Sequence, residues 1–241
     1  MGRHGTIAGR KAAQDAKRAA MFTKYTRAII VAAKNGSNPE YNASLRLAIE
    51  KAKAISLPND KIQRAIKKGS GELEGESYTE QTFEGYGPGG VAIIVDTLSD
   101  NTNRVTSAVR SAFDKHGGNL GTPGCVSYMF SRKGVIIIEK KDGVTEDDVM
   151  ECALEAGAED IITNEDNFEV ITDPSTYTDV HEALVKAGYE PVESDIEYVP
   201  SMEASPEEEH DIAKLKKLID VLEDNDDVQK VHTNCGIDLY E

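Results

Sequence analysis

Residues 134–199 read GVIIIEKKDGVTEDDVMECALEAGAEDIITNEDNFEVITDPSTYTDVHEALVKAGYEPVESDIEYV. Short runs rich in β-branched residues predict four strands in this segment, and two stretches with helical periodicity lie between them. The predicted elements span residues 135–139, 145–156, 160–163, 168–172, 175–187 and 192–199. Their order is β-α-β-β-α-β, which is the order of the ferredoxin-like fold. We therefore predict a ferredoxin-like α/β domain over residues 134–202.

The segments that flank this domain predict further strands and helices, but the segment on its C-terminal side is too small to fold alone. Before the domain come a predicted strand, helix and strand, and after it a predicted helix and strand. These elements span residues 90–97, 102–116, 125–131, 205–222 and 228–233. Together they would complete a second unit of the same order. We therefore predict a split α/β domain made of residues 80–133 and 203–241, with 134–202 inserted in it.

The beginning of the chain has helical periodicity only. From Arg10 to Lys34 no Gly or Pro interrupts the sequence, and two shorter apolar-periodic segments come next, before Gly69. Three short helices with apolar stripes predict a helical domain over residues 1–75. The predicted fold class is therefore α+β: an N-terminal helical bundle followed by two ferredoxin-like α/β domains, one inserted in the other.

Charge is distributed very unevenly along the chain. The 241 residues carry a net charge of −16, yet residues 1–70 contain 15 Lys+Arg against 4 Asp+Glu, a net of +11. The remaining residues contain 12 Lys+Arg against 39 Asp+Glu, a net of −27. A basic end on an acidic protein is typical of a chain that binds a polyanion through that end.

The basic residues of the helical domain are the candidate binding residues. Cations presented together bind phosphates because each neutralised phosphate releases condensed counterions. The alternative is a solvated helix face, but such a face normally contains interspersed acids, and Asp15 is the only acid before Glu40. The residues expected to bind nucleic acid are Arg10, Lys11, Lys17, Arg18, Lys24, Arg27, Lys34, Lys61, Arg64, Lys67 and Lys68.

A second polar group lies at the predicted start of the helix at 102–116. The side chains of Asn101, Asn103 and Arg104 are expected to cap this helix. They could also make a secondary phosphate contact, since free N–H groups at a helix N-terminus attract anions. Capping alone and capping with a phosphate contact both stay open.

Motifs for cofactors and catalysis are absent from the sequence. Residues 85–90 (GYGPGG) match G-x-G-x-x-G, but a dinucleotide site follows a strand and opens a helix, whereas this motif precedes a strand and Pro88 has no N–H. We therefore predict a turn there. The sequence contains no H-E-x-x-H, C-x-x-C, G-x-S-x-G or Walker A motif. We expect a protein that is not an enzyme and holds no cofactor or metal.

Composition also gives an expected location. The three Cys, at 125, 152 and 235, lie far apart, which is typical of a reducing cytosol. No apolar run approaches the ~20 residues that cross a bilayer, so we expect no membrane association. The first 22 residues share a basic composition with mitochondrial transit peptides, but they lack Ser and the basic pattern continues past residue 60. We therefore expect a cytoplasmic protein.

Several motifs together resemble the YebC family over essentially the whole chain. They are RKAAQDAKR at 10–18, PND at 58–60, AIKKG at 65–69, EGYGPGGVA at 84–92 and DNTNR at 100–104. The resemblance implies a helical N-terminal domain, two α/β domains, no catalytic activity and no cofactor. Most members are labelled as transcriptional regulators that bind DNA, whereas a mitochondrial translational activator of cytochrome c oxidase subunit I acts in translation.

These observations support three hypotheses about function. The first is a non-enzymatic, DNA-binding transcriptional regulator that docks on phosphates through its basic helical domain. The alternative is a ribosome-associated translation factor that uses the same cations on ribosomal RNA or tRNA. The third, less favoured, is a protein-interaction scaffold or an enzyme whose site the motifs do not reveal. The oligomeric state stays open, with a monomer favoured.

Overall fold

The N-terminal region is a bundle of three helices. The computed structural model describes residues 7–75, 77–141 and 143–239, with side chains from residue 18 onward. Ile29, Leu45 and Ile62, one from each helix, are fully buried in a common core. The ends of two helices come very close, because a Cβ atom on Gly69 would lie 2.3 Å from the carbonyl oxygen of Ile30. The helices are α1 (Ile7–Ala33), α2 (Ala43–Ala54) and α3 (Asn59–Gly69).

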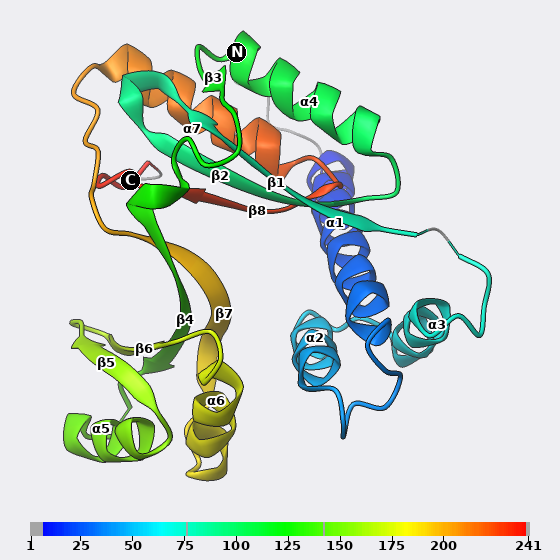
Figure 1. Cartoon of the computed structure of the whole chain (residues 1–241), viewed down its shortest axis with the longest axis vertical. Helices are drawn as coiled ribbons and strands as arrows, with labels where there is room; N and C mark the ends of the chain where they lie inside the picture. Colours follow the sequence, from blue (N-terminus) through cyan, green and yellow to red (C-terminus); the bar gives the residue numbers. More distant parts are fainter. Residues whose placement is uncertain (1–6, 76, 142, 240–241) are drawn as a thin grey trace.

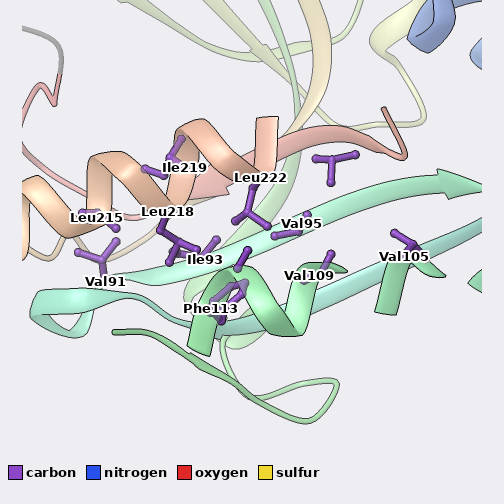
Figure 2. Packing of buried hydrophobic residues seen from close by; sticks show 12 residues of the cluster. Val91, Ile93, Val95, Val105, Val109, Phe113, Leu215, Leu218, Ile219 and Leu222 are labelled. Carbon is purple, nitrogen blue, oxygen red and sulfur yellow. The ribbon is translucent and has the colours of Figure 1, made fainter. Parts of the chain in front are cut away.

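The next unit is built on a four-stranded antiparallel sheet, which we call sheet A. Its strands lie in the order β3-β1-β2-β8. Two helices, α4 and α7, pack their apolar sides against it, and Figure 2 shows Ile93 of β2, Phe113 of α4 and Leu218 of α7 pointing toward one another. The elements are β1 (Thr79–Tyr86), β2 (Ala92–Ser99), α4 (Thr102–Lys115), β3 (Asn119–Leu120), α7 (Glu209–Glu223) and β8 (Val228–Thr233).

The segment between β3 and α7 forms a second four-stranded sheet, sheet B. Its strand order, β5-β6-β4-β7, is that of a ferredoxin-like domain, and every pairing is antiparallel. Ile136, Phe168 and Val170 are buried under its two helices. The elements are β4 (Phe130–Glu139), α5 (Glu146–Glu155), β5 (Ala158–Thr163), β6 (Asn167–Thr172), α6 (Tyr177–Lys186) and β7 (Pro191–Pro200).

The predicted fold class is confirmed, since a helical region precedes two antiparallel four-stranded sheets with helices. The division into three domains at the stated residue limits stays a prediction. Around sheet A the chain order is β-β-α-β before the inserted segment and α-β after it. The predicted order before the insert was strand, helix, strand, and the structure adds β1 in front of the strand predicted at 90–97. The glycine-rich residues form the predicted turn, which contains the short helix η1 (Pro88–Gly90) and joins β1 to β2.

One predicted strand is wrong. Residues 125–131 are predicted to be extended, but they contain the short helix η2 (Ser127–Met129), and β4 begins at Phe130 and runs unbroken to Glu139. The reason is the buried carboxylate of Glu84, which accepts backbone N–H groups from Gly124, Val126 and Ser127 at 2.8–3.0 Å. These N–H groups are therefore not available for strand pairing.

Ion pairs join the three units where they meet. On α2, Arg46 pairs with Glu182 of α6, and Lys51 Nζ lies 2.7 Å from Asp195 Oδ1 of β7. Figure 1 shows α1 running from the end of sheet A to α2 and α3, with β4 and β7 leading from sheet A to sheet B. In the part of the chain that the structure describes, no helix combines the length and apolar character needed to span a bilayer.

Candidate nucleic-acid interface

Helix α3 presents cations along its solvent side. Its buried residues Ile62, Ala65 and Ile66 face the bundle core, and this fixes the opposite side toward solvent. Three of its cations are exposed and the fourth is half-buried, at spacings of three and four residues that bring side chains to one side of a helix. We call this set the α3 ridge. It consists of Lys61, Arg64, Lys67 and Lys68.

Phe22 brings a cation of α1 to the α3 ridge. The guanidinium carbon of Arg18 lies 5.3 Å from the centroid of the Phe22 ring, and Lys61 Nζ lies 5.5 Å from the same centroid. Both cations remain exposed while they contact the ring, which itself packs on the bundle core. A cation near an aromatic face gains about 0.5–1 kcal/mol at an exposed site. The contact therefore holds Arg18 and Lys61 on one surface.

The cations of this surface are not neutralised by the described part of the chain. Among the described residues, Arg18 and the four members of the α3 ridge form no ion pair with any carboxylate. Lys53, near the end of α2, is likewise exposed and without an ion pair there. Lys53 was not among the candidate residues predicted from the sequence. Its place in the last turn of a predicted helix, where lysine is common, was the signal that could have identified it as exposed. Unpaired like charges repel, so this surface favours an anionic partner.

Arg27, by contrast, is a structural residue. Its Nη1 donates hydrogen bonds to Asp227 Oδ1 at 2.8 Å and to the carbonyl oxygen of Leu98 at 3.2 Å, and it also contacts the carbonyl oxygen of Asp226. The guanidinium carbon lies 5.3 Å from the ring centroid of Tyr78. The side chain is only 12% exposed. Arg27 therefore fixes α1 to sheet A, and a phosphate would have to displace a buried carboxylate to reach it.

Lys24 and Lys34 each donate a hydrogen bond to a backbone carbonyl group elsewhere in the chain. Lys24 Nζ donates to the carbonyl oxygen of Glu223 at 2.6 Å, and burial lowers the pKa of this lysine although carboxylates nearby oppose the change. Lys34, which follows the end of α1, is exposed, and its Nζ donates to the carbonyl oxygen of Tyr78 at 2.9 Å. Among the described cations of α1, Arg18 thus faces solvent, and Lys24 and Arg27 hold α1 against other parts of the chain.

Three further candidates precede Arg18 on the first helix. Arg10, Lys11 and Lys17 lie within α1, but their side chains are outside the described residues. Their part in binding stays a prediction.

The group at the start of α4 is held by hydrogen bonds of its own. Asn101 caps the helix, since its Oδ1 accepts the N–H of Arg104 at 3.0 Å. The Arg104 guanidinium donates to Asp100 at 2.6 Å and to Asp227 at 2.9 Å. These two contacts raise the pKa of Arg104, and the bond to Arg104 lowers the pKa of Asp100. Asn103 is exposed. Two carboxylates beside Arg104 disfavour binding of a phosphate there. The capping role of Asn101 is the role that a hydrogen bond in the structure supports.

A metal-binding arrangement is not visible in the described part of the chain. There, no three His, Cys, Asp or Glu residues come together in a way that would hold a metal ion. Burial raises the pKa of the thiols of Cys125 and Cys152, which disfavours the reactive thiolate.

Family models, curated proteins and a solved structure are similar to this chain over nearly its whole length. Residues 3–72 match a family model described as the TACO1/YebC protein N-terminal domain, and residues 78–235 match one described as the TACO1/YebC second and third domain. A probable transcriptional regulatory protein of Clostridioides difficile is 53% identical over 99% of this chain and 100% of that protein. One of Caldanaerobacter subterraneus is 51% identical over 96% of each chain. The crystal structure of a conserved hypothetical protein from Aquifex aeolicus is 47% identical, with a TM-score of 0.83, over 93% of this chain and 92% of that one.

Proposed function

The chain belongs to the TACO1/YebC family, and from this membership we propose that it is a DNA-binding regulatory protein that docks through Arg18 and the α3 ridge. The names of its relatives support a regulatory role with nucleic acid as partner. The observation that carries the proposal is the solvent side of α3, where Lys61, Arg64 and Lys67 are exposed and form no ion pair in the described part of the chain.

Helices α2 and α3 have the connection of a helix-turn-helix. Only residues 55–58 separate the end of α2 at Ala54 from the start of α3 at Asn59. In helix-turn-helix proteins a turn of three or four residues joins two helices, and the second helix enters the major groove. Helix α3 occupies that second place, and three of its cations are exposed along one side. We therefore assign α3 as the helix that enters the groove.

The side chains of α3 have suitable chemistry for both kinds of contact. Gln63 and Arg64 are exposed, and amides and guanidinium groups are the groups that read adenine and guanine edges in the major groove. Lys61, Lys67 and Lys68 are point charges suited to phosphates, which position a protein without reading sequence. In this proposal Arg18 contacts the phosphate beside Lys61.

A translational role is the second candidate. The observation that favours it is that the matching family is named for TACO1 as well as YebC, and TACO1 abbreviates the translational activator of cytochrome c oxidase subunit I. The same cations would then lie on RNA, whose duplex has a deep, narrow major groove that side chains cannot read. In that case α3 would contact phosphates only, and Gln63 would make no base contact.

Binding of the full-length protein to matched duplexes tests the proposal. Fluorescence anisotropy with DNA and RNA duplexes of one sequence, at several salt concentrations, gives both affinity and salt slope. We expect tighter binding to DNA, and we expect Gln63→Ala to reduce discrimination between DNA sequences without changing the salt slope. Tighter binding to RNA with no effect of Gln63→Ala would support the translational role. Binding to neither would overturn both.

A further inference from the structure

Sheet B has two faces of different character. Its helix-covered face consists of apolar residues buried under α5 and α6, and Figure 1 shows these two helices on the same side of the sheet. Side chains alternate along a strand, so Ile137 points away from the side to which Ile136 and Ile138 point. The two middle rows of residues on the side away from the helices form what we call the acidic face. They are Val135, Ile137, Asp160, Ile162, Glu169, Ile171, Glu193 and Asp195.

Strand register places carboxylates and aliphatic side chains next to each other on this face. One row across the sheet reads Asp160, Ile171, Val135, Asp195 from β5 to β7. The next row reads Ile162, Glu169, Ile137, Glu193 in the same direction. Directly opposite residues on neighbouring strands are close enough to act on one partner. Val135 is buried, and the aliphatic side chains that remain accessible on the acidic face are Ile137, Ile162 and Ile171, each with a carboxylate beside it.

Only one corner of this face is neutralised. Asp195 pairs with Lys51 of α2 at 2.7 Å and with Lys230 of β8 at 3.5 Å. Asp160, Glu169 and Glu193 form no ion pair with any described residue, although Glu193 lies near enough to Lys230 to raise its pKa. Ile162 is 45% exposed. The protein itself thus shows, at Asp195, that this face accepts lysine side chains.

The chemistry of the face limits what can cover it. A nucleic acid would be repelled by three unpaired carboxylates. A purely apolar partner would remove those carboxylates from water without compensation, which is strongly unfavourable for each buried ion. A segment that carries both cations and aliphatic side chains would pair the carboxylates and bury the isoleucines together. Complementary charge also speeds association and excludes wrong partners.

We propose that the acidic face of sheet B binds a lysine- or arginine-rich protein segment that also carries aliphatic side chains. This binding is separate from nucleic-acid docking, because the α3 ridge and the acidic face lie on different units of the chain. The protein would then join a nucleic acid on its basic helical domain to a basic protein segment on its inserted unit.

A labelled peptide of alternating lysine and valine is the direct probe. About ten residues span about 33 Å when extended, which crosses four strands spaced about 4.8 Å apart. Its affinity for the full-length protein is measured by anisotropy, beside a peptide of alternating lysine and serine. The face variant is Glu169→Gln with Glu193→Gln. The matched control is Glu151→Gln with Glu155→Gln, which removes the same charge from the exposed side of α5.

We expect the lysine–valine peptide to bind, and we expect the face variant to weaken it about fivefold to tenfold while the control changes it less than about twofold. Ile162→Ser should weaken the lysine–valine peptide but not the lysine–serine peptide. Equal weakening by the face variant and the control would overturn the proposal, because attraction would then follow total charge.

Two further results would also overturn it. One is the absence of peptide binding by the folded wild-type protein, with folding checked by circular dichroism. The other is a dimer in light scattering that the face variant converts to monomer, since the occupant would then be a second copy of this chain. Nucleic-acid affinity of the face variant should be unchanged. If the wild-type protein bound no nucleic acid, only the proposed function would fail, and the peptide result would still decide this inference.

Discussion

Arg27 Nη1 lies 2.8 Å from Asp227 Oδ1, and the two residues are 200 positions apart in the chain. Asp227 is almost fully buried and also accepts hydrogen bonds from Arg104 at 2.9 and 3.0 Å. One carboxylate thus holds a guanidinium of α1 and another of α4. This pair of contacts explains why a cation of the basic helical domain is turned toward the acidic part of the molecule.

Arg27→Ala should destabilise the protein by about 2 kcal/mol, because it leaves a buried carboxylate with one partner instead of two. Urea unfolding gives the change in the free energy of unfolding. Arg110→Ala is the matched control, since Arg110 is exposed on α4 and has no ion pair within the described chain; it should stay within about 0.5 kcal/mol. An Arg27→Ala protein of unchanged stability but weaker nucleic-acid binding would show that Arg27 belongs to the interface.

Glu84→Gln should cost about 2 kcal/mol at neutral pH, because the carboxylate accepts three backbone N–H groups and is 8% exposed. Burial opposes ionisation of Glu84, but the N–H donors outweigh it and lower the pKa of this carboxyl. A lowered pKa in the folded state stabilises the protein above the usual carboxyl range, and the stabilisation is lost as the pH falls through and below that range.

The difference in unfolding free energy between wild type and Glu84→Gln should therefore shrink as the pH falls below about 4. Glu80→Gln, on the exposed part of the same strand, is the control and should show little difference at any pH. A difference that stays constant from neutral to acidic pH would mean that the charge of Glu84 does not contribute.

Gly69→Ala should destabilise the helical bundle. Alanine favours helices by up to about 1 kcal/mol over glycine, but the new Cβ would lie 2.3 Å from the Ile30 carbonyl oxygen and 2.6 Å from Ala33 Cβ. Overlap of this size costs about 1–3 kcal/mol, so the net change is a loss. The melting temperature checks the sign. Gly75→Ala is the control, because the atoms nearest to its new Cβ belong to the flexible side chain of Lys68. An increase in melting temperature for Gly69→Ala would contradict the close crossing of α1 and α3.

The sequence was sufficient for the fold wherever local pattern and tertiary environment agree. The β-branched runs around Ile136 and Val170 predicted the strands of sheet B because those residues are also its core. Strand β1 was missed since its sequence, TEQTFEGY, has few apolar residues and lies at mixed exposure. The η2 turn was missed because it depends on Glu84, about 40 positions away.

The candidate site divides in the same way. The exposed side of α3 could be predicted from its apolar residues, since burial of Ile62 and Ile66 decides which side faces solvent. The inward direction of Lys24 and Arg27 could not be predicted, because their partners are Glu223 and Asp227 at the far end of the chain. No local signal distinguishes a lysine that binds phosphate from one that contacts a distant carbonyl group.

The salt dependence of nucleic-acid binding tests the central claim most directly. The variant Lys61→Gln, Arg64→Gln, Lys67→Gln, Lys68→Gln is compared with a control that removes four exposed cations from α4 and α7, namely Arg110→Gln, Lys115→Gln, Lys214→Gln, Lys217→Gln. Each lost contact to a phosphate of duplex DNA reduces the slope of log K against log salt by about 0.9. We predict a reduction of about 2 to 3 for the α3 variant, since Lys61, Lys67 and Lys68 are its phosphate contacts, and of less than about 1 for the control. Equal reductions in the two proteins would contradict docking through α3.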